Sequence, residues 1–162
     1  MKKLFLILLA ALLLLLSACS QSQPREDQIA FYYQASTMKY DPNYSPFQAE
    51  YRNSSDYETL EQALSAYFAG PLGAELDNPF PVGLSLISYR EENGTLHLIL
   101  DDSLAKLTGK ELSIACCCIA KTCLGLTDAE KISISAENEL LDGEKSITLS
   151  QDTMNLLDNS QH

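Results

Sequence analysis

The first apolar stretch of the chain is continuous rather than periodic. Every residue from 4 to 16 is apolar, and Met1-Lys2-Lys3 places positive charge in front of them. As a helix, this stretch would be about 20 Å long, whereas a bilayer core is about 30 Å thick. It is therefore too short for a membrane span and is typical of a secretory signal peptide.

Farther along the chain, apolar residues recur with two different periods. Alternation of apolar and polar residues predicts β-strands, and the clearest case places Leu96, Leu98 and Leu100 on one face. Asn93-Gly94, just before that segment, predicts a hairpin turn. The segments predicted as strands are 28–36, 47–52, 84–89, 95–101, 131–136 and a short one at 147–149.

Helical spacing of apolar residues predicts a first helix that begins near Ser55. Ser55 with Glu58 three residues later is typical of a capping box, in which each residue bonds a backbone N–H near the other. Gly70-Pro71 ends the helix, because glycine suits a left-handed exit and proline cannot continue the hydrogen-bond ladder.

A second helix is predicted from about Lys110 to Leu124. Thr108 and Glu111 have the spacing of another capping box, and Gly125 is expected to end the helix.

The order of these elements is two strands, a helix, a hairpin, a second helix and one or two further strands. We therefore expect an α+β fold, in which a small mixed or antiparallel sheet carries both helices on one face. No internal repeat is present, so residues 28–150 are expected to form one domain and residues 151–162 a polar tail.

The signal-like stretch ends in Leu-Ser-Ala-Cys, which resembles the lipobox of bacterial lipoproteins. This resemblance implies cleavage after residues 1–18 and a lipid on the thiol of Cys19, with residues 19–27 as a flexible tether. Two acyl chains are sufficient for stable anchoring. The expected location is extracytoplasmic, on the cell membrane, and an ordinary cleaved signal peptide is the alternative.

Charge narrows the classes of partner. Without residues 1–18 the chain has nine basic and 22 acidic residues, a net charge of −13. Such a surface repels nucleic acid and anionic headgroups, so nucleic-acid binding is not expected.

The remaining cysteines, Cys116, Cys117, Cys118 and Cys123, fall within eight residues of the second predicted helix. A structural disulfide framework would spread its cysteines along the chain. Consecutive helical residues point about 100° apart, so these thiols do not converge on one metal. We expect them to be buried, and we assign no metal or cofactor. A Cys116–Cys123 pairing, or a redox- or metal-binding role for this helix, remains the alternative.

Catalytic motifs are missing from the sequence. It contains no Gly-x-Ser-x-Gly, no His-Glu-x-x-His and no phosphate-binding glycine loop. The histidines are His97 and His162, so a tethered hydrolase would depend on His97 activating a nearby cysteine. We assign no catalytic residue.

Tyrosines are concentrated near the start of the domain, at Tyr32, Tyr33, Tyr40, Tyr44 and Tyr51. They could form a contact surface for a partner, because tyrosine is enriched at interfaces, or they could pack under the first strand pair. Composition does not separate these two interpretations.

Several short motifs together resemble those of a known family. They are the helix end Ala63–Pro71, Pro81-x-Gly83 with the strand pair of 84–100, Lys121–Leu124, Lys131–Ser135 and Gly143. The set is similar to the GerMN domain of GerM-type sporulation and spore-germination proteins, over roughly residues 28–150. GerM-type proteins often hold two such domains, whereas this chain holds one.

The resemblance implies a fold like that of the ring-building modules of envelope assemblies, without catalytic residues. The function to expect is a lipid-anchored, non-enzymatic envelope module that binds protein, or peptidoglycan, in sporulation, germination or envelope maintenance. Its expected partners are the membrane, through the lipid on Cys19, and envelope proteins or a second copy of the chain.

Overall fold

The computed structural model describes residues 25–36 and 45–154. None of the helices in these residues has both the length and the apolar character that a membrane span requires. The elements, in chain order, are β1 (Gln28–Ala35), β2 (Phe47–Asn53), α2 (Leu60–Phe68), β3 (Leu76–Asp77), β4 (Leu86–Glu92), β5 (Thr95–Leu100), α3 (Gly109–Leu126), β6 (Lys131–Ala136) and β7 (Ile147–Ser150).

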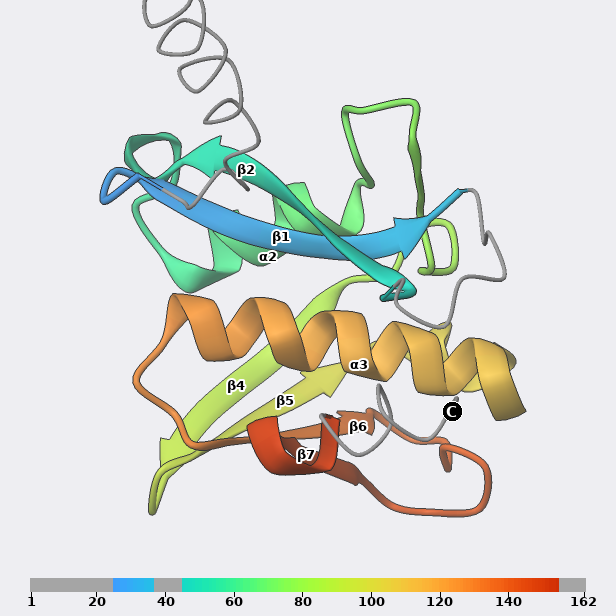
Figure 1. The fold of residues 1–162 in the computed structure, drawn as a ribbon. Helices are drawn as coiled ribbons and strands as arrows, with labels where there is room; N and C mark the ends of the chain where they lie inside the picture. The colour runs from blue at the N-terminus through green and yellow to red at the C-terminus, as the bar shows by residue number, and fades with distance from the viewer. Residues whose placement is uncertain (1–24, 37–44, 155–162) are drawn as a thin grey trace, which may run out of the picture.

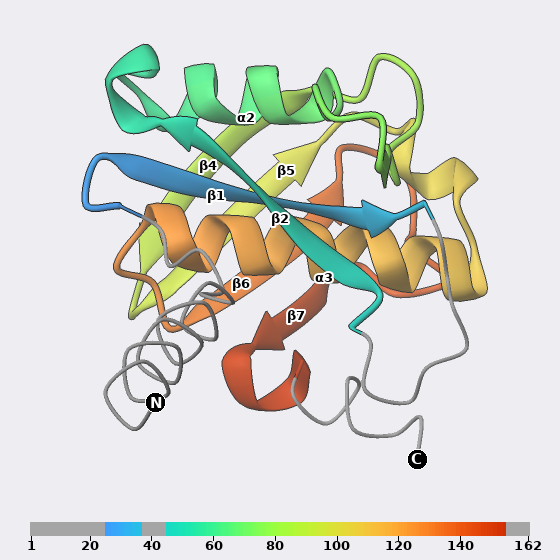
Figure 2. The same ribbon diagram turned by 45° about the horizontal axis from the view of Figure 1, so that its top comes forward.

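The strands form two sheets, with the helices between them. The first sheet has the order β2-β1-β3 and the second the order β4-β5-β6-β7. Figures 1 and 2 show the first sheet on one side of α2 and α3 and the second sheet on the other side. The predicted α+β fold with both helices on one face of a mixed sheet is confirmed for the second sheet. A separate sheet of β1, β2 and β3 was not predicted from the sequence, and β3 itself was not among the predicted strands.

The second sheet is mixed because α3 connects β5 to β6 and makes this pair of strands parallel. β4 and β5 are antiparallel and joined by the predicted hairpin, where Asn93 and Gly94 have φ angles of 51° and 72°. β6 returns parallel to β5 after α3, and β7 pairs antiparallel with β6. A parallel pair needs a long crossover, and α3 supplies it.

The predicted alternation places the apolar residues of the second sheet in the core. Leu96, Leu98 and Leu100 are at most 1% exposed, and Ile132 and Ile134 are fully buried. Burial of such a side chain contributes roughly 1.5–3 kcal/mol each.

An aromatic cluster joins α2 to the first sheet. The ring of Tyr67 lies 5.2 Å from that of Phe31 and 5.0 Å from that of Tyr33, measured between centroids. Phe80, from the loop before β4, packs edge-on against Tyr67 at 4.8 Å. Such contacts stabilise beyond the area they bury, so this cluster fixes how α2 lies against β1.

The predicted start of the first helix is wrong by about five residues. Residues 54–56 form a 3-10 turn, and α2 begins at Leu60 with Thr59 as its N-cap. The Thr59 hydroxyl accepts from the N–H of Gln62 at 3.3 Å, and the Gln62 amide oxygen accepts from the N–H of Glu58 at 2.8 Å. Thr59 with Gln62 therefore has the capping role that the sequence analysis gave to Ser55 and Glu58.

The second helix differs from its prediction at both ends. Thr108 is its N-cap but makes no side-chain cap bond, and instead the Asp142 carboxylate accepts from the N–H of Gly109 at 2.7 Å. Gly125 does not end the helix, which continues to Leu126. Thr127 is its C-cap, where the backbone becomes extended, with φ −135° and ψ 167°. The Thr127 hydroxyl also donates to the carbonyl of Cys123 at 3.0 Å.

Candidate functional site

The predicted lipidation site, Cys19, lies outside the described residues, as do the signal-like segment and Tyr40 and Tyr44. Lipidation of Cys19 therefore stays a prediction. The other predicted sites lie in the described part of the chain.

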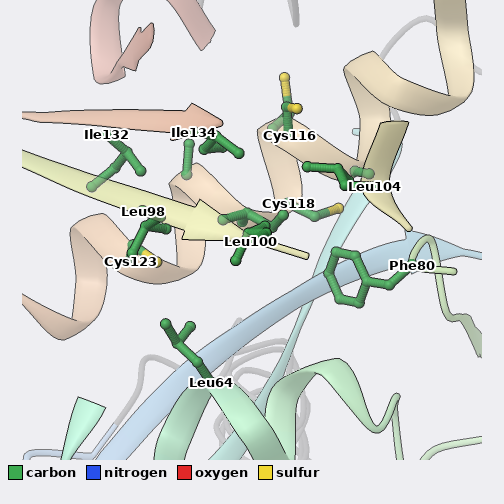
Figure 3. Packing of buried hydrophobic residues seen from close by; sticks show 14 of the residues in the cluster. Leu64, Phe80, Leu98, Leu100, Leu104, Cys116, Cys118, Cys123, Ile132 and Ile134 are labelled. Atoms are coloured by element: carbon green, nitrogen blue, oxygen red, sulfur yellow. The ribbon is translucent and has the colours of Figure 1, made fainter. Parts of the chain in front are cut away.

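The four cysteines of α3 are core residues, at 0–3% exposure. Figure 3 shows Cys116, Cys118 and Cys123 in the cluster that also contains Leu98 and Leu100. Burial is the main cause that raises the pKa of Cys116 and of Cys123 to about 12, and it raises the pKa of Cys118 even further. Because the thiolate is the nucleophile and the metal ligand, these thiols are in an inert form near neutral pH.

The second sheet separates His97 from these thiols. His97 lies between Leu96 and Leu98 on β5, and those leucines face the core while His97 is half-exposed on the other face. The cysteine–histidine pair that a hydrolase would need is therefore not brought together. Among the residues that the structure describes, no group of three or more His, Cys, Asp or Glu side chains could hold a metal ion.

The tyrosines divide between the two interpretations. Tyr33 is fully buried, and its hydroxyl donates to the carbonyl of Tyr67 at 2.9 Å, so it packs under the first strand pair. Tyr32 and Tyr51 are half-buried on the other face of that pair. Lys121 lies 5.8 Å from the centre of the Tyr32 ring, a cation–π contact that attaches α3 to this face.

The outer face of the second sheet has a hollow of about 320 Å³. Its floor is made of two neighbouring rows of cross-strand partners. One row is Arg90, His97 and Ser133, on β4, β5 and β6, and the other is Ser88, Ile99 and Ser135 on the same strands. Cross-strand partners have Cβ atoms about 5 Å apart, so each row forms a continuous polar or mixed surface.

Tyr89 on β4, together with Lys145 and Ser146, which precede β7, completes the lining of the hollow. Arg90, His97 and Lys145 line it without any carboxylate, although acidic residues outnumber basic ones 22 to 11 in the whole chain. Cationic and hydroxyl groups of this kind can bind an anionic, hydrogen-bonding group.

This hollow was not predicted from the sequence, although His97 was expected on the face opposite the core leucines. The missing information was the pairing of strands. Serines at alternate positions of residues 131–136 look like an ordinary solvated face until β5 and β6 are known to be adjacent.

The family model Germane, described as sporulation and spore germination, matches residues 30–142. No curated protein matches the chain in sequence. The tandem GerMN domains of the sporulation protein GerM from Bacillus subtilis have a similar fold, with a TM-score of 0.58 and 17% identity. That match covers 82% of this chain and 49% of the other, so the chain spans about half the length of that structure.

A second solved structure, of a candidate lipoprotein from Clostridium perfringens, has a TM-score of 0.49 and 16% identity, and the match covers 82% of this chain and 94% of the other.

The resemblance to the GerMN domain is confirmed by the family match, which includes both helices and six of the seven strands in full or in most of their length. The chain belongs to the Germane family of sporulation and spore-germination domains.

Proposed function

We propose that this protein is a lipid-anchored, non-enzymatic module of the cell envelope that binds partner proteins in sporulation, germination or envelope maintenance. The observation that carries the proposal is a GerMN fold whose thiols are closed inside the core, on the opposite side of a sheet from His97. Such a domain can offer surfaces to partners but has no cysteine–histidine chemistry to offer a substrate.

Anchoring would contribute directly to binding. A domain held at the membrane by the lipid on Cys19 is confined to a thin layer of solvent, so its effective concentration towards partners in that layer rises. Even a weak interface then becomes useful. GerM has a similar fold and carries two such domains in tandem, so association between domains of this type is the mode of binding to test first.

The anchor is tested by Cys19→Ala in the full chain expressed in a bacterial host. We expect the variant to leave the membrane fraction or to remain as an uncleaved precursor, since the thiol that accepts the lipid is gone. Ser20→Ala is the matched control and should behave as the unchanged chain. Normal processing and membrane retention of Cys19→Ala would show that the anchor is not a lipid on this residue.

Binding is tested by crosslinking in intact cells, followed by identification of the proteins joined to the chain. We expect defined partners or a second copy, and we expect them to be lost when Cys19→Ala releases the chain from the membrane. If only the uncrosslinked monomer is recovered at every stage of growth and sporulation, the assembly role is wrong.

A further inference from the structure

We propose that the hollow on the outer face of the second sheet is a binding site for a small acidic sugar, that is, a sugar that carries a carboxylate. This inference goes beyond the proposed partner binding and does not depend on it. It is based on the charge, the hydroxyl groups and the size of the hollow.

Charge at the hollow is opposite to that of the chain. Two of the eight described Lys and Arg side chains line it together with His97, and no lining residue is acidic. In residues 25–36 and 45–154, the ion pairs are Arg52 with Glu50 and Arg90 with Glu92. Lys145 and His97 therefore have no carboxylate partner there, which leaves them available for a ligand carboxylate.

The ligand charge that fits best is a single negative charge. Arg90 lies 3.7 Å from the carboxylate of Glu92, and both side chains are more than half exposed. Such a surface pair is weak and leaves most of the guanidinium free, but Glu92 would oppose a dianionic phosphate more than a carboxylate. A guanidinium also matches the two oxygens of a carboxylate in geometry.

The hydroxyl groups of the lining suit the remainder of a sugar. Ser88 and Ser146 line the hollow with hydroxyls that can both donate and accept, as sugar hydroxyls do, and Ser133 lies beside them at 7% exposure. The Ser135 hydroxyl donates to the carbonyl of Leu98 at 3.1 Å, so towards a ligand its oxygen can act only as an acceptor. Ile99, between Ser88 and Ser135 on the floor, offers an apolar surface to the C–H side of a sugar ring.

Size and rigidity limit the ligand to about one sugar unit. The hollow holds about 320 Å³, which is at the small end of ligand sites in proteins, roughly 300–1,000 Å³. Its floor consists of paired strands rather than loops, so the backbone under the floor is ordered before the ligand binds. The side chains of Arg90 and Lys145 are exposed and become ordered on binding.

The experiment follows the imidazole proton signals of His97 by NMR in the full chain, purified in detergent, and uses His162 as the comparison signal. The probe is sodium glucuronate. Glucose, which lacks the carboxylate, and acetate, which lacks the hydroxyls, are the controls for each half of the recognition. We expect saturable shifts of the His97 signals with glucuronate, at an affinity about tenfold higher than for glucose or acetate, since a charge-assisted hydrogen bond contributes that much.

Variants locate the site. Arg90→Gln and Lys145→Gln should each weaken glucuronate binding about tenfold, whereas Lys110→Gln, on an exposed position of α3, should not change it. Arg90 is 69% exposed, so its replacement is not expected to disturb the fold, and unchanged signals elsewhere in the spectrum check this.

Three results would overturn the proposal. They are equal affinities for glucuronate and glucose, unsaturable shifts that move His97 and His162 alike, and binding that is unchanged in both Arg90→Gln and Lys145→Gln. Tighter binding of glucose 6-phosphate than of glucuronate would also overturn it, because it would assign the site to phosphate. None of these results affects the anchoring and crosslinking tests, so the two proposals fail separately.

Discussion

Arg52 on β2 is a residue on which the start of the domain depends. Its guanidinium donates to the carbonyls of Ala66 and Gly70 at the end of α2, at 3.2 and 2.9 Å, and pairs with Glu50 at 2.7 Å. The other oxygen of Glu50 accepts from the N–H groups of Leu72 and Gly73. Two side chains of one strand therefore hold the exit of α2 and the loop that follows it.

Replacement of Arg52 by methionine should lower the free energy of unfolding by roughly 3 kcal/mol, because it leaves Glu50 and two helix carbonyls partly buried without their partner. Urea unfolding measures the change. Arg90→Met, at a position that is 69% exposed, is the matched control and should change stability by less than about 0.5 kcal/mol. Equal losses in the two variants would contradict this role of Arg52.

Acid should act on the same cluster through Glu50. Burial by itself raises the pKa of this carboxyl, but the N–H of Gly73, the Arg52 guanidinium and the N–H of Leu72 outweigh burial and lower the pKa below its usual value. A carboxyl with a lowered pKa in the folded state contributes stability that is present above its unfolded pKa, near 4.3. That stability is lost as the pH falls through the folded value.

Glu50→Gln should therefore reduce stability at neutral pH and flatten its decline below about pH 4.3. Urea midpoints measured from pH 7 down to pH 3 test this. Glu137→Gln, at an exposed position, is the control for the change in net charge. If the decline in acid is as steep in Glu50→Gln as in the unchanged chain, Glu50 is not its source.

At the scale of elements, the helix ends show how similar motifs acquire different roles. Gly70 and Gly125 were both expected to end helices, and only Gly70 does so. Gly70 has a φ of 103°, a conformation that other residues adopt with strain. Gly125 lies inside α3, and a methyl group there would meet nothing within 4 Å. The carbonyl of Gly70 accepts a hydrogen bond from Arg52, whereas the hydrogen-bond ladder of α3 continues past Gly125.

Alanine substitution separates the two glycines. Gly70→Ala should cost about 1–3 kcal/mol, since it forces a strained φ, and its Cβ would lie 2.9 Å from the side chain of Asn78. Gly125→Ala should stabilise the protein by up to about 1 kcal/mol, because alanine loses less backbone entropy in a helix. Thermal unfolding of the two variants gives the comparison, and a loss of stability in Gly125→Ala would show that α3 is strained there.

At the scale of the whole molecule, α3 is the element on which both sheets pack. The N–H of Tyr32 on β1 donates to the buried hydroxyl of Thr122 at 2.9 Å, while Ile119 and Cys123 of α3 belong to the core shared with the second sheet. Because α3 is covered on both sides, its cysteines should become accessible only when the layers separate.

Thiol labelling tests this arrangement. In the folded protein, Cys116, Cys118 and Cys123 should react with iodoacetamide at a rate that follows global unfolding, since burial excludes the reagent and raises the thiol pKa. In concentrated guanidinium they should react at once. The labelled peptide is identified by mass spectrometry, and rapid labelling of Cys118 in native conditions would mean that α3 opens by itself.

Most of the fold could be predicted because its signals are local. The alternation in β5 and β6 and the Asn93-Gly94 turn need only a few neighbouring residues to be recognised, and all three were found where they were expected. The helix starts were less well predicted, because the residues that cap the first backbone N–H groups of a helix were either ambiguous in the sequence or distant along the chain. For α2, both Ser55 with Glu58 and Thr59 with Gln62 have the spacing of a capping box, and the sequence does not choose between them. For α3, the cap is the carboxylate of Asp142, which lies 33 residues from Gly109 in the chain.

By itself, the sequence determined six of the seven described strands and both described helices in outline, the burial of the cysteines and of the leucines of β5, and the family to which the chain belongs. Only the tertiary structure decided that the strands form two sheets and that Arg90, His97 and Ser133 share one row over a hollow. The physical reason is the range of the interactions. Periodicity is set by the geometry of one segment, whereas strand pairing depends on segments that are far apart in the chain. β1 is an example, because the N–H of its Tyr32 donates to the Thr122 hydroxyl of α3 and not to another strand.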